Sequence, residues 1–239
     1  MPDFSVRSRE AEMMDDFSLG HPVIDPIMDE LEVVNRLLGG YHVFFDAFKK
    51  IGLSNEMTIS DWGCGGGDSL RVIAQWARKR KLKIKLIGVD ATSAAVEYAR
   101  ESSKDFPEIT FLHLEVMSPQ LKEEQFDIVI SSLFTHHFPD KDWIDLVKKM
   151  RSCARRYVVI NDLHRHWFAY HSIGILTALF SNSEMVKHDS KVSVLRGFKR
   201  SDLEKMLQEA EIQNFSIKWM WAFRWQVILD VNYDPVSII

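Results

Sequence analysis

The sequence predicts an α/β fold built on a doubly wound, mostly parallel seven-stranded sheet with an antiparallel C-terminal hairpin. Three observations lead to this prediction. From Met57 onward, short runs rich in Ile, Val and Leu alternate with amphipathic helical stripes. A glycine-rich turn joins the first of these runs to the first helix. Two more strand-like runs lie within residues 212–230, with a break near Met220 to Ala222.

Residues 1–54 are predicted to form an N-terminal helical cap, because apolar residues such as Ile27, Leu31 and Val34 recur there at helical spacing. Strands are then expected at residues 57–61, 84–89, 109–114, 126–131 and 156–160. Alternation within these runs is weak, which suits a sheet that is covered on both faces.

The helices that cross between strands are predicted from single apolar stripes. One stripe runs from Leu70 to Ala77 and another from Trp143 to Met150. A later helix is expected to begin at Ser201, because Ser201 and Glu204 have the spacing of a capping box.

Composition excludes several classes of protein. With 239 residues, 46% of them hydrophobic, the chain can bury the core of one large domain. A net charge of −4 gives no long-range attraction for a polyanion, so nucleic acid is not an expected partner. No apolar run approaches the ~20 residues that span a bilayer, and the N-terminus does not resemble a signal peptide. Two separate cysteines, Cys64 and Cys153, fit a cytoplasmic location.

The sharpest motif is the run Asp61-Trp62-Gly63-Cys64-Gly65-Gly66-Gly67-Asp68, which lies between the first strand and its helix. A tight turn that lets a ligand approach the backbone selects glycine, since side chains obstruct it and positive φ is needed. Asp90 closes the second strand, where an acid can accept two ribose hydroxyls. The alternatives are a turn without a ligand and an Asp90 that only caps a helix, a role for which Thr92 competes.

Asp68 distinguishes between a dinucleotide and a nucleoside without phosphate as the ligand of this turn. A nicotinamide dinucleotide places its pyrophosphate at the helix N-terminus, where the charge of Asp68 would repel it. A ligand that has a ribose for Asp90 and a cation near Asp61, but no phosphate, is compatible with the charge of Asp68. S-adenosylmethionine, a nucleoside with a sulfonium and an amino group, is such a ligand.

At this point the chain resembles the class I methyltransferases, whose first motif is an acid followed by G-x-G-x-G. The resemblance covers roughly residues 57–160 and implies a Rossmann-like domain over residues 55–239 that uses S-adenosylmethionine. Residues 126–131 resemble the family's fourth motif. The cofactor-binding residues implied are Asp61, Gly63, Cys64, Gly65, Gly67, Asp68, Asp90, Ala91, Glu115, Val116 and Ser131. Polar candidates in the N-terminal helices, if these close over the cofactor, are Arg9, Asn35, Arg36 and Tyr41.

Histidines follow both the fourth and the fifth predicted strand, at the sheet edge where ligands bind in such folds. Methyl transfer to a hydroxyl needs a base, and histidine suits that role. His136 or His164 is therefore the expected base, with Asp162 as its orienter. The alternatives are that His137 only hydrogen-bonds its loop and that Asp162 caps the following helix.

A metal site is the alternative use of these histidines, because His164-x-His166 and His136-His137 could meet in space. None is expected. Some quinone-ring O-methyltransferases that this segment resembles have carboxylates where Leu133 and His136 stand, and a hard cation requires those oxygens.

The acceptor is expected to be a small apolar or aromatic molecule: a phenol, a quinone precursor or a polyketide. The family often inserts a lid after the fifth strand, here residues 167–196, and residues 167–180 are apolar on nearly every face. That helix either packs in the core or lines an apolar pocket. O-methylation is the favoured reaction, and the alternatives are C-methylation, protein methylation and non-catalytic cofactor binding. Ser131 to Phe134 lacks the Pro-Pro-aromatic motif of nucleic-acid amino-methyltransferases.

Overall fold

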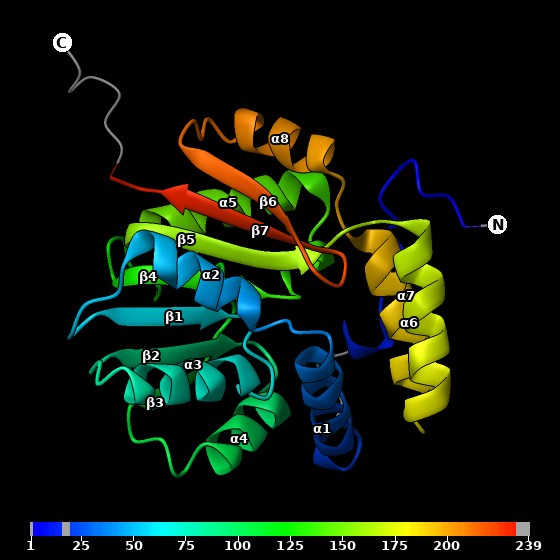
Figure 1. The fold of residues 1–239 in the computed structure, drawn as a ribbon, viewed down its shortest axis with the longest axis horizontal. Helices are drawn as coiled ribbons and strands as arrows, with labels where there is room; N and C mark the ends of the chain where they lie inside the picture. Colours follow the sequence, from blue (N-terminus) through cyan, green and yellow to red (C-terminus); the bar gives the residue numbers. More distant parts are fainter. Residues whose placement is uncertain (1, 16–19, 233–239) are drawn as a thin grey trace.

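The computed structural model describes residues 2–15 and 20–232 and contains a seven-stranded mixed sheet in the order β3-β2-β1-β4-β5-β7-β6 (Figure 1). Strands β1 to β5 run parallel, and β7 pairs antiparallel with both β5 and β6. The strands are β1 Thr58–Trp62, β2 Lys85–Asp90, β3 Ile109–His113, β4 Phe126–Ser132, β5 Ala154–Leu163, β6 Phe215–Met220 and β7 Arg224–Asp230. The predicted Rossmann-like sheet and its C-terminal hairpin are confirmed.

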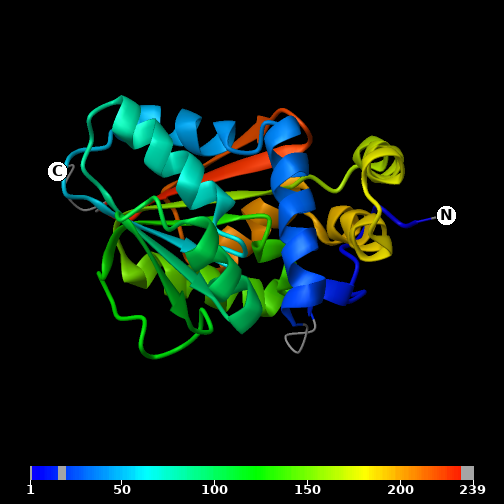
Figure 2. The ribbon, with the colours of Figure 1, turned by 90° about the horizontal axis from the view of Figure 1, so that it is seen from below.

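Helices cover both faces of the sheet, as the weak alternation of the strands predicts (Figure 2). One face packs against α2 (His42–Ile51), α3 (Asp68–Lys79) and α4 (Ser93–Ser102). The other packs against α5 (Asp140–Cys153) and α8 (Arg200–Glu209). The apolar stripes of α3 and α5 are buried in these two cores, which fixes the sheet between them.

Three further helices lie beyond the carboxyl ends of the parallel strands (Figures 1 and 2). They are α1 (His21–Leu37), α6 (Trp167–Phe180) and α7 (Glu184–Arg196). Short 3-10 helices at Met13–Asp15 and Thr135–His137 lie in the same region and contact α7. No helix within the described ranges is both long and apolar enough to cross a membrane.

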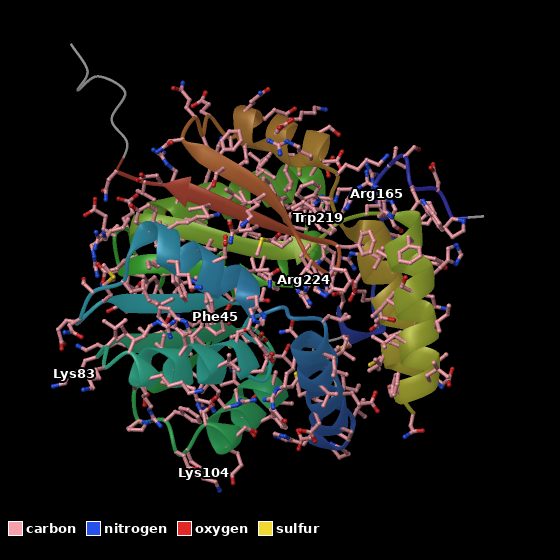
Figure 3. The ribbon with its side chains drawn as sticks, viewed as in Figure 1. Phe45, Lys83, Lys104, Arg165, Trp219 and Arg224 are labelled. Carbon is pink, nitrogen blue, oxygen red and sulfur yellow. The ribbon has the colours of Figure 1, made fainter. Side chains whose placement is uncertain are left out.

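Helix α6 does not pack in the core, although it is apolar on nearly every face. Only Ala169 and Thr177 of this helix are buried, and Leu179 is 72% exposed. It packs against α7 instead, as Figure 3 also shows with the side chains drawn, and Ile173 reaches the cavity described below.

Two boundary predictions are wrong. Strand β5 continues to Leu163, because residues 157–163 pair with β7, so Asp162 lies inside a strand and His166 caps α6 instead. Helix α8 begins at Arg200, not Ser201, and the backbone N–H of Lys199 donates to Asp202 at 2.8 Å.

Candidate active site

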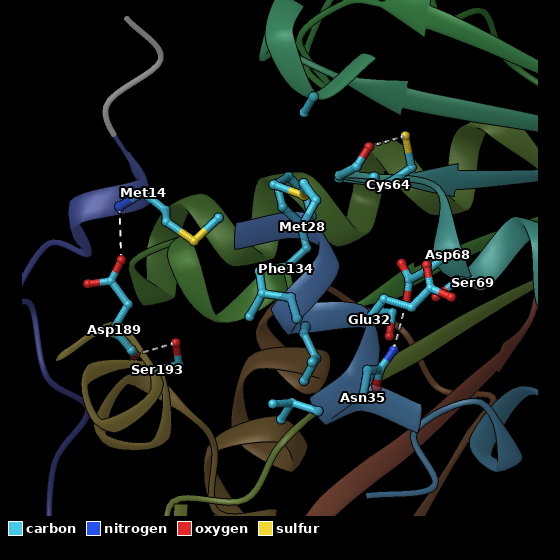
Figure 4. Close-up of a pocket in the computed structure, with 18 of the residues that line it drawn as sticks. Met14, Met28, Glu32, Asn35, Cys64, Asp68, Ser69, Phe134, Asp189 and Ser193 are labelled. Carbon is cyan, nitrogen blue, oxygen red and sulfur yellow. Dashed lines mark hydrogen bonds between the residues drawn. The ribbon is translucent and has the colours of Figure 1, made fainter. Parts of the chain in front are cut away.

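A cavity of about 530 Å³ lies at the carboxyl ends of β1 and β4. Its wall is formed by the glycine turn, the inner face of α1, the segment after β4, and parts of α6 and α7. Figure 4 shows one side of this wall, with Asn35 and Asp68 joined by a hydrogen bond and Met28 near the middle of the space. The cavity occupies the place where open α/β sheets bind their ligands.

The glycine turn has the backbone that its sequence predicts. Gly63, Gly65 and Gly67 have φ values of 69°, 48° and 72°, in the left-handed region that favours glycine. A Cβ on Gly63 would meet the Phe134 ring at 2.1 Å, and one on Gly67 would meet Phe111 at 2.8 Å. Gly63, Cys64 and Gly65 line the cavity, whereas Gly67 allows close helix-to-sheet packing.

Three carboxylates border the turn: Asp61, Asp68 and Asp90. Asp61 is 1% exposed, and its Oδ1 has no hydrogen-bond partner among residues 2–15 and 20–232. Burial, followed by the charges of Asp68 and Asp90, raises the pKa of Asp61 well above its ordinary value. An uncompensated buried acid of this kind fits a cationic ligand such as a sulfonium with an amino group.

Asp90 ties the turn to β2. Its Oδ2 accepts the Gly65 N–H at 2.8 Å, and its Oδ1 accepts the Thr92 N–H at 2.9 Å. Thr92, not Asp90, is the N-cap residue of α4. Each carboxylate oxygen keeps further acceptor capacity on the cavity side, as a ribose diol requires.

Five of the predicted cofactor residues lie off the cavity wall: Gly67, described above, and Ala91, Glu115, Val116 and Ser131. Glu115 is exposed, and Val116 belongs to the core. The Ser131 hydroxyl on β4 donates to the Trp62 carbonyl at 2.9 Å, which ties β4 to the end of β1, where the glycine turn begins. Their roles as direct cofactor contacts stay predictions.

A polar network around Asp68 adds a residue that the sequence did not indicate. The amide of Asn35 donates to Asp68 at 3.1 Å and the hydroxyl of Tyr41 donates to it at 2.7 Å. Arg224, fully buried on β7, donates to Asn35 Oδ1 at 3.0 Å. Burial lowers the pKa of Arg224 to about 10, and its Nε has no partner within the described parts of the chain. Asn35 and Arg224 are suited to hold a carboxylate such as that of the methionine moiety.

His136 and Asp162 meet at the other side of the cavity. The Nδ1 of His136 lies 2.6 Å from Asp162 Oδ1, and both side chains are buried. Asp162 also accepts from the Thr135 hydroxyl at 2.7 Å and from the Leu163 N–H at 2.7 Å. These bonds fix the carboxylate so that it orients the imidazole, as expected for the pair; the catalytic role stays a prediction.

The N-terminal segment brings two acids to the histidines, Glu12 and Asp15, that the sequence did not indicate. Glu12 Oε1 lies 3.4 Å from His136 Nε2, and Glu12 Oε2 lies 3.9 Å from His137 Nε2. His137 Nδ1 lies 2.6 Å from Asp15, which also pairs with Arg196 at 2.7 Å. His137 therefore bonds this segment rather than its own loop.

The charges around His136 change its chemistry. Burial alone would lower its pKa, but the charge and hydrogen bond of Asp162, then those of Glu12, raise the pKa of His136 to about 9. Burial likewise opposes ionisation of Asp162, and His136 overrides it and lowers the pKa of Asp162 to about 2. While Glu12 lies against it, His136 holds both ring protons near neutral pH, which differs from the free base that the sequence suggested.

His164 lies apart from these residues. It does not line the cavity, and its ring packs between Trp225 at 4.9 Å and His166 at 5.3 Å, measured between ring centroids. Burial, followed by the charges of His166 and Arg165, lowers the pKa of His164 to about 4. Of the two expected bases, only His136 faces the cavity.

A family model described as a methyltransferase domain matches residues 59–156, the part that carries the glycine turn and Asp90. The match identifies residues 59–156 as a methyltransferase domain, the class of enzyme domain that uses S-adenosylmethionine as its cofactor. The glycine backbone and Asp61, whose Oδ1 lacks a partner in the described parts of the chain, are consistent with that cofactor. No curated protein sequence matches this chain.

Several solved structures share the fold. A putative O-methyltransferase from Nostoc punctiforme has a TM-score of 0.62 and 15% identity, covering 95% of this chain and 63% of that one. The CMeT domain of the citrinin polyketide synthase has a TM-score of 0.61 and 13% identity, covering 81% of this chain and 52% of that one. A plantazolicin methyltransferase in complex with SAH has a TM-score of 0.60 and 16% identity, covering 83% and 84%. The chain thus spans about half the length of the CMeT domain chain that it matches.

Proposed function

We propose that the enzyme methylates an oxygen atom of a small apolar or aromatic acceptor, such as a phenol, a quinone precursor or a polyketide-like molecule. One observation carries the proposal: the cavity that begins at the glycine turn continues into an apolar space that ends at a buried histidine and its acids. The apolar lining consists of Leu133, Phe134, Ile173, Val186 and Val194. Such a lining favours a flat or greasy ligand with a single polar group.

The acceptor space has walls on several sides, which favours a small molecule over a protein side chain. Residues of α1, α6 and α7 all line it, and Met14 and Asp15 contribute from the N-terminal segment. The backbone N–H of Ser8 donates to the Leu195 carbonyl at 3.0 Å, so this segment is bound to α7. A protein substrate would require an open groove here. We therefore assign residues 1–54 the role of a cap that reaches both ends of the cavity, and residues 167–196 the role of a lid over the acceptor end.

The proposed division of roles follows the two ends of the cavity. Asp61, Asp90 and Arg224 hold the amino, ribose and carboxylate groups of the cofactor, which supplies an electrophilic methyl group when bound. The acceptor hydroxyl lies toward His136, which Asp162 orients. The chain then aligns the hydroxyl oxygen with the methyl carbon, and His136 takes the hydroxyl proton once its own Nε2 proton has left.

Carbon methylation is the second candidate, because an enol or phenol carbon also needs a proton removed. The fold resembles that of the citrinin polyketide synthase CMeT domain as well as that of a putative O-methyltransferase. Product structure separates the two: a methyl ether in one case and a new carbon–carbon bond in the other.

The test is turnover of a panel of phenols, hydroxyquinones and polyketide-like enols with methyl-labelled cofactor, followed by mass spectrometry of the products. We expect methyl ethers, and a fall in kcat of about 10²–10⁴-fold in His136→Ala and Asp162→Asn. The control is His171→Ala, since His171 is exposed on α6. Products methylated only on carbon, or undiminished rates in both variants, would contradict the proposal.

A further inference from the structure

We propose that Glu12, His136 and His137 form a binding site for one divalent transition-metal ion at the acceptor end of the cavity. The binding claim is independent of the acceptor, whereas the role of the ion in activating a hydroxyl rests on the proposed function. We call these three residues the EHH cluster. Nothing in the sequence had paired Glu12 with the histidines, and the tertiary structure alone brings them together.

The ligand atoms of the EHH cluster converge on one point. One carboxylate oxygen and one ring nitrogen from each histidine all lie within 4.8 Å of one another. The Glu12 oxygens lie 3.4 Å from His136 Nε2 and 3.9 Å from His137 Nε2. In a tetrahedral site with bonds of about 2.0–2.1 Å, ligand atoms are about 3.3 Å apart. The cluster therefore needs only a small contraction to hold an ion.

Both histidines are held in the orientation that metal ligands have. His136 Nδ1 lies 2.6 Å from Asp162, and His137 Nδ1 lies 2.6 Å from Asp15. A carboxylate that accepts the Nδ1 proton fixes the ring and leaves Nε2 as the donor of a lone pair. Two such pairs side by side, with both Nε2 atoms facing one acid, indicate a built site.

Glu12 Oε1 and His136 Nε2 lie 3.4 Å apart as a loose ion pair, and neither atom has a well-formed hydrogen bond within residues 2–15 and 20–232. Their side chains are only 5% and 2% exposed. Buried polar atoms normally find a partner, because an unsatisfied one costs about 1–3 kcal/mol. An ion between them would satisfy both. Without an ion, a proton on His136 takes its place, so ion and proton compete for Nε2.

The surrounding charges favour a cation. Glu12, Asp15 and Asp162 contribute three negative charges. Arg196, 2.7 Å from Asp15 and 3.8 Å from Glu12, and Arg7, which donates to the His136 carbonyl at 3.0 Å, contribute two positive charges. With both imidazoles neutral, the acids still outnumber the guanidinium groups, and buried charges of this kind are paired or bind a metal ion.

The ligand set selects the kind of ion. Two imidazole nitrogens and one carboxylate suit Zn²⁺, Mn²⁺ or Fe²⁺, and suit Mg²⁺ or Ca²⁺ poorly. The expectation of no metal rested on Leu133 and His136 standing where related enzymes have carboxylates, and Glu12 supplies a carboxylate from a distant segment. Three protein ligands leave a position open, and all three residues line the cavity.

The open position gives the ion a role in methyl transfer. The acceptor hydroxyl binds there, and the ion lowers its pKa so that the O–H proton passes to water. The oxygen lone pair then forms a bond to the methyl carbon, while the carbon–sulfur bond breaks and its electron pair stays on sulfur. His136 acts through the ion, with Asp162 behind it.

The experiment measures metal binding directly. Enzyme treated with a chelator and freed of it is titrated with Zn²⁺ and Mn²⁺ by calorimetry without acceptor, and with Co²⁺ by visible absorption. We expect about one equivalent to bind, with Co²⁺ giving the strong absorption of a low-coordinate site. Glu12→Gln and His137→Ala should each weaken binding at least tenfold, whereas His171→Ala should not. Cofactor affinity, measured on the same samples, should stay unchanged and so shows that the variants are folded.

The outcomes separate the two proposals. Equal metal affinity in the wild type, Glu12→Gln and His137→Ala would overturn the site, and so would the absence of binding in the wild type. Full turnover by metal-free enzyme would overturn the activating role of the ion. Metal binding with the expected losses, but without methylation of any hydroxyl acceptor, would support the site and contradict the proposed O-methylation.

Discussion

At the scale of single residues, the acids at the glycine turn repel one another electrostatically at the proposed cofactor end of the cavity. Asp61 is buried without a partner for its Oδ1 in the described parts of the chain, close enough to Asp68 and Asp90 for their charges to oppose its ionisation. This arrangement destabilises the empty site and favours a cation. For the same electrostatic reason, the charge of Asp68 disfavours a ligand that carries phosphate.

Binding of the cofactor should release protons through Asp61. The pKa of Asp61 is raised in the empty enzyme and a cationic ligand lowers it, so binding should release a proton at pH values between these two pKa values. Affinity should therefore fall as the pH is lowered through the raised pKa of the free enzyme, and be highest above it. Calorimetry in two buffers of different ionisation enthalpy measures the protons released.

Asp61→Asn is the control for that measurement. It should remove the proton release and weaken cofactor binding by about tenfold or more, since a charged hydrogen-bond partner is worth about 1.5–3 kcal/mol. Proton release of the same size in Asp61→Asn and wild type would show that another group titrates.

At the scale of elements, the strand, turn and helix of residues 58–79 form one unit that the sequence predicts well. The prediction succeeded because the residues that define the turn are local: β1 ends, the backbone enters positive φ, and α3 begins. The length of β5 was missed for the opposite reason. Its extension to Leu163 depends on pairing with β7, which is about 60 residues away in the chain.

Gly63→Ala tests the turn. The substitution combines an unfavourable positive φ with a clash of its Cβ against the Phe134 ring at 2.1 Å. We expect a loss of stability of about 2–4 kcal/mol, seen in denaturant unfolding, and a loss of cofactor binding.

Gly52→Ala is the matched control, because Gly52 has a φ of 70° but no atom within 4 Å of the position that a Cβ would take. It should cost only the backbone strain of its φ of 70° and ψ of 123°, about 1–3 kcal/mol, and leave cofactor affinity unchanged. Equal losses in the two variants would mean that backbone strain, and not the packing of Phe134, dictates glycine in the turn.

At the scale of the whole molecule, an N-terminal segment and helix α7 together complete the acceptor end. Arg196 donates to the carbonyls of His136, at 3.3 Å, and of His137, at 2.6 Å, and pairs with Asp15. One guanidinium thus links the two histidines to the segment that carries Glu12. The cofactor end depends on other contacts.

Arg196→Met should separate the two ends. We expect a marked fall in kcat, with faster cleavage of residues 1–15 by protease, while cofactor affinity stays within about twofold of wild type. Arg200→Met is the control, since Arg200 is exposed and pairs with Glu204 on the surface. A wild-type kcat in Arg196→Met would show that the histidines hold their positions without this link.

The sequence by itself determined the parallel sheet, the glycine turn, its bordering acids and the histidines at the sheet edge, because each depends on local periodicity or on the backbone demands of one turn. Only the tertiary structure decided that His136 faces the cavity and His164 does not, that Arg224 reaches Asp68 through Asn35, and that Glu12 meets both histidines. These contacts join segments far apart in the chain, and no local pattern marks a side chain whose partner is supplied by the way the sheet and its helices pack.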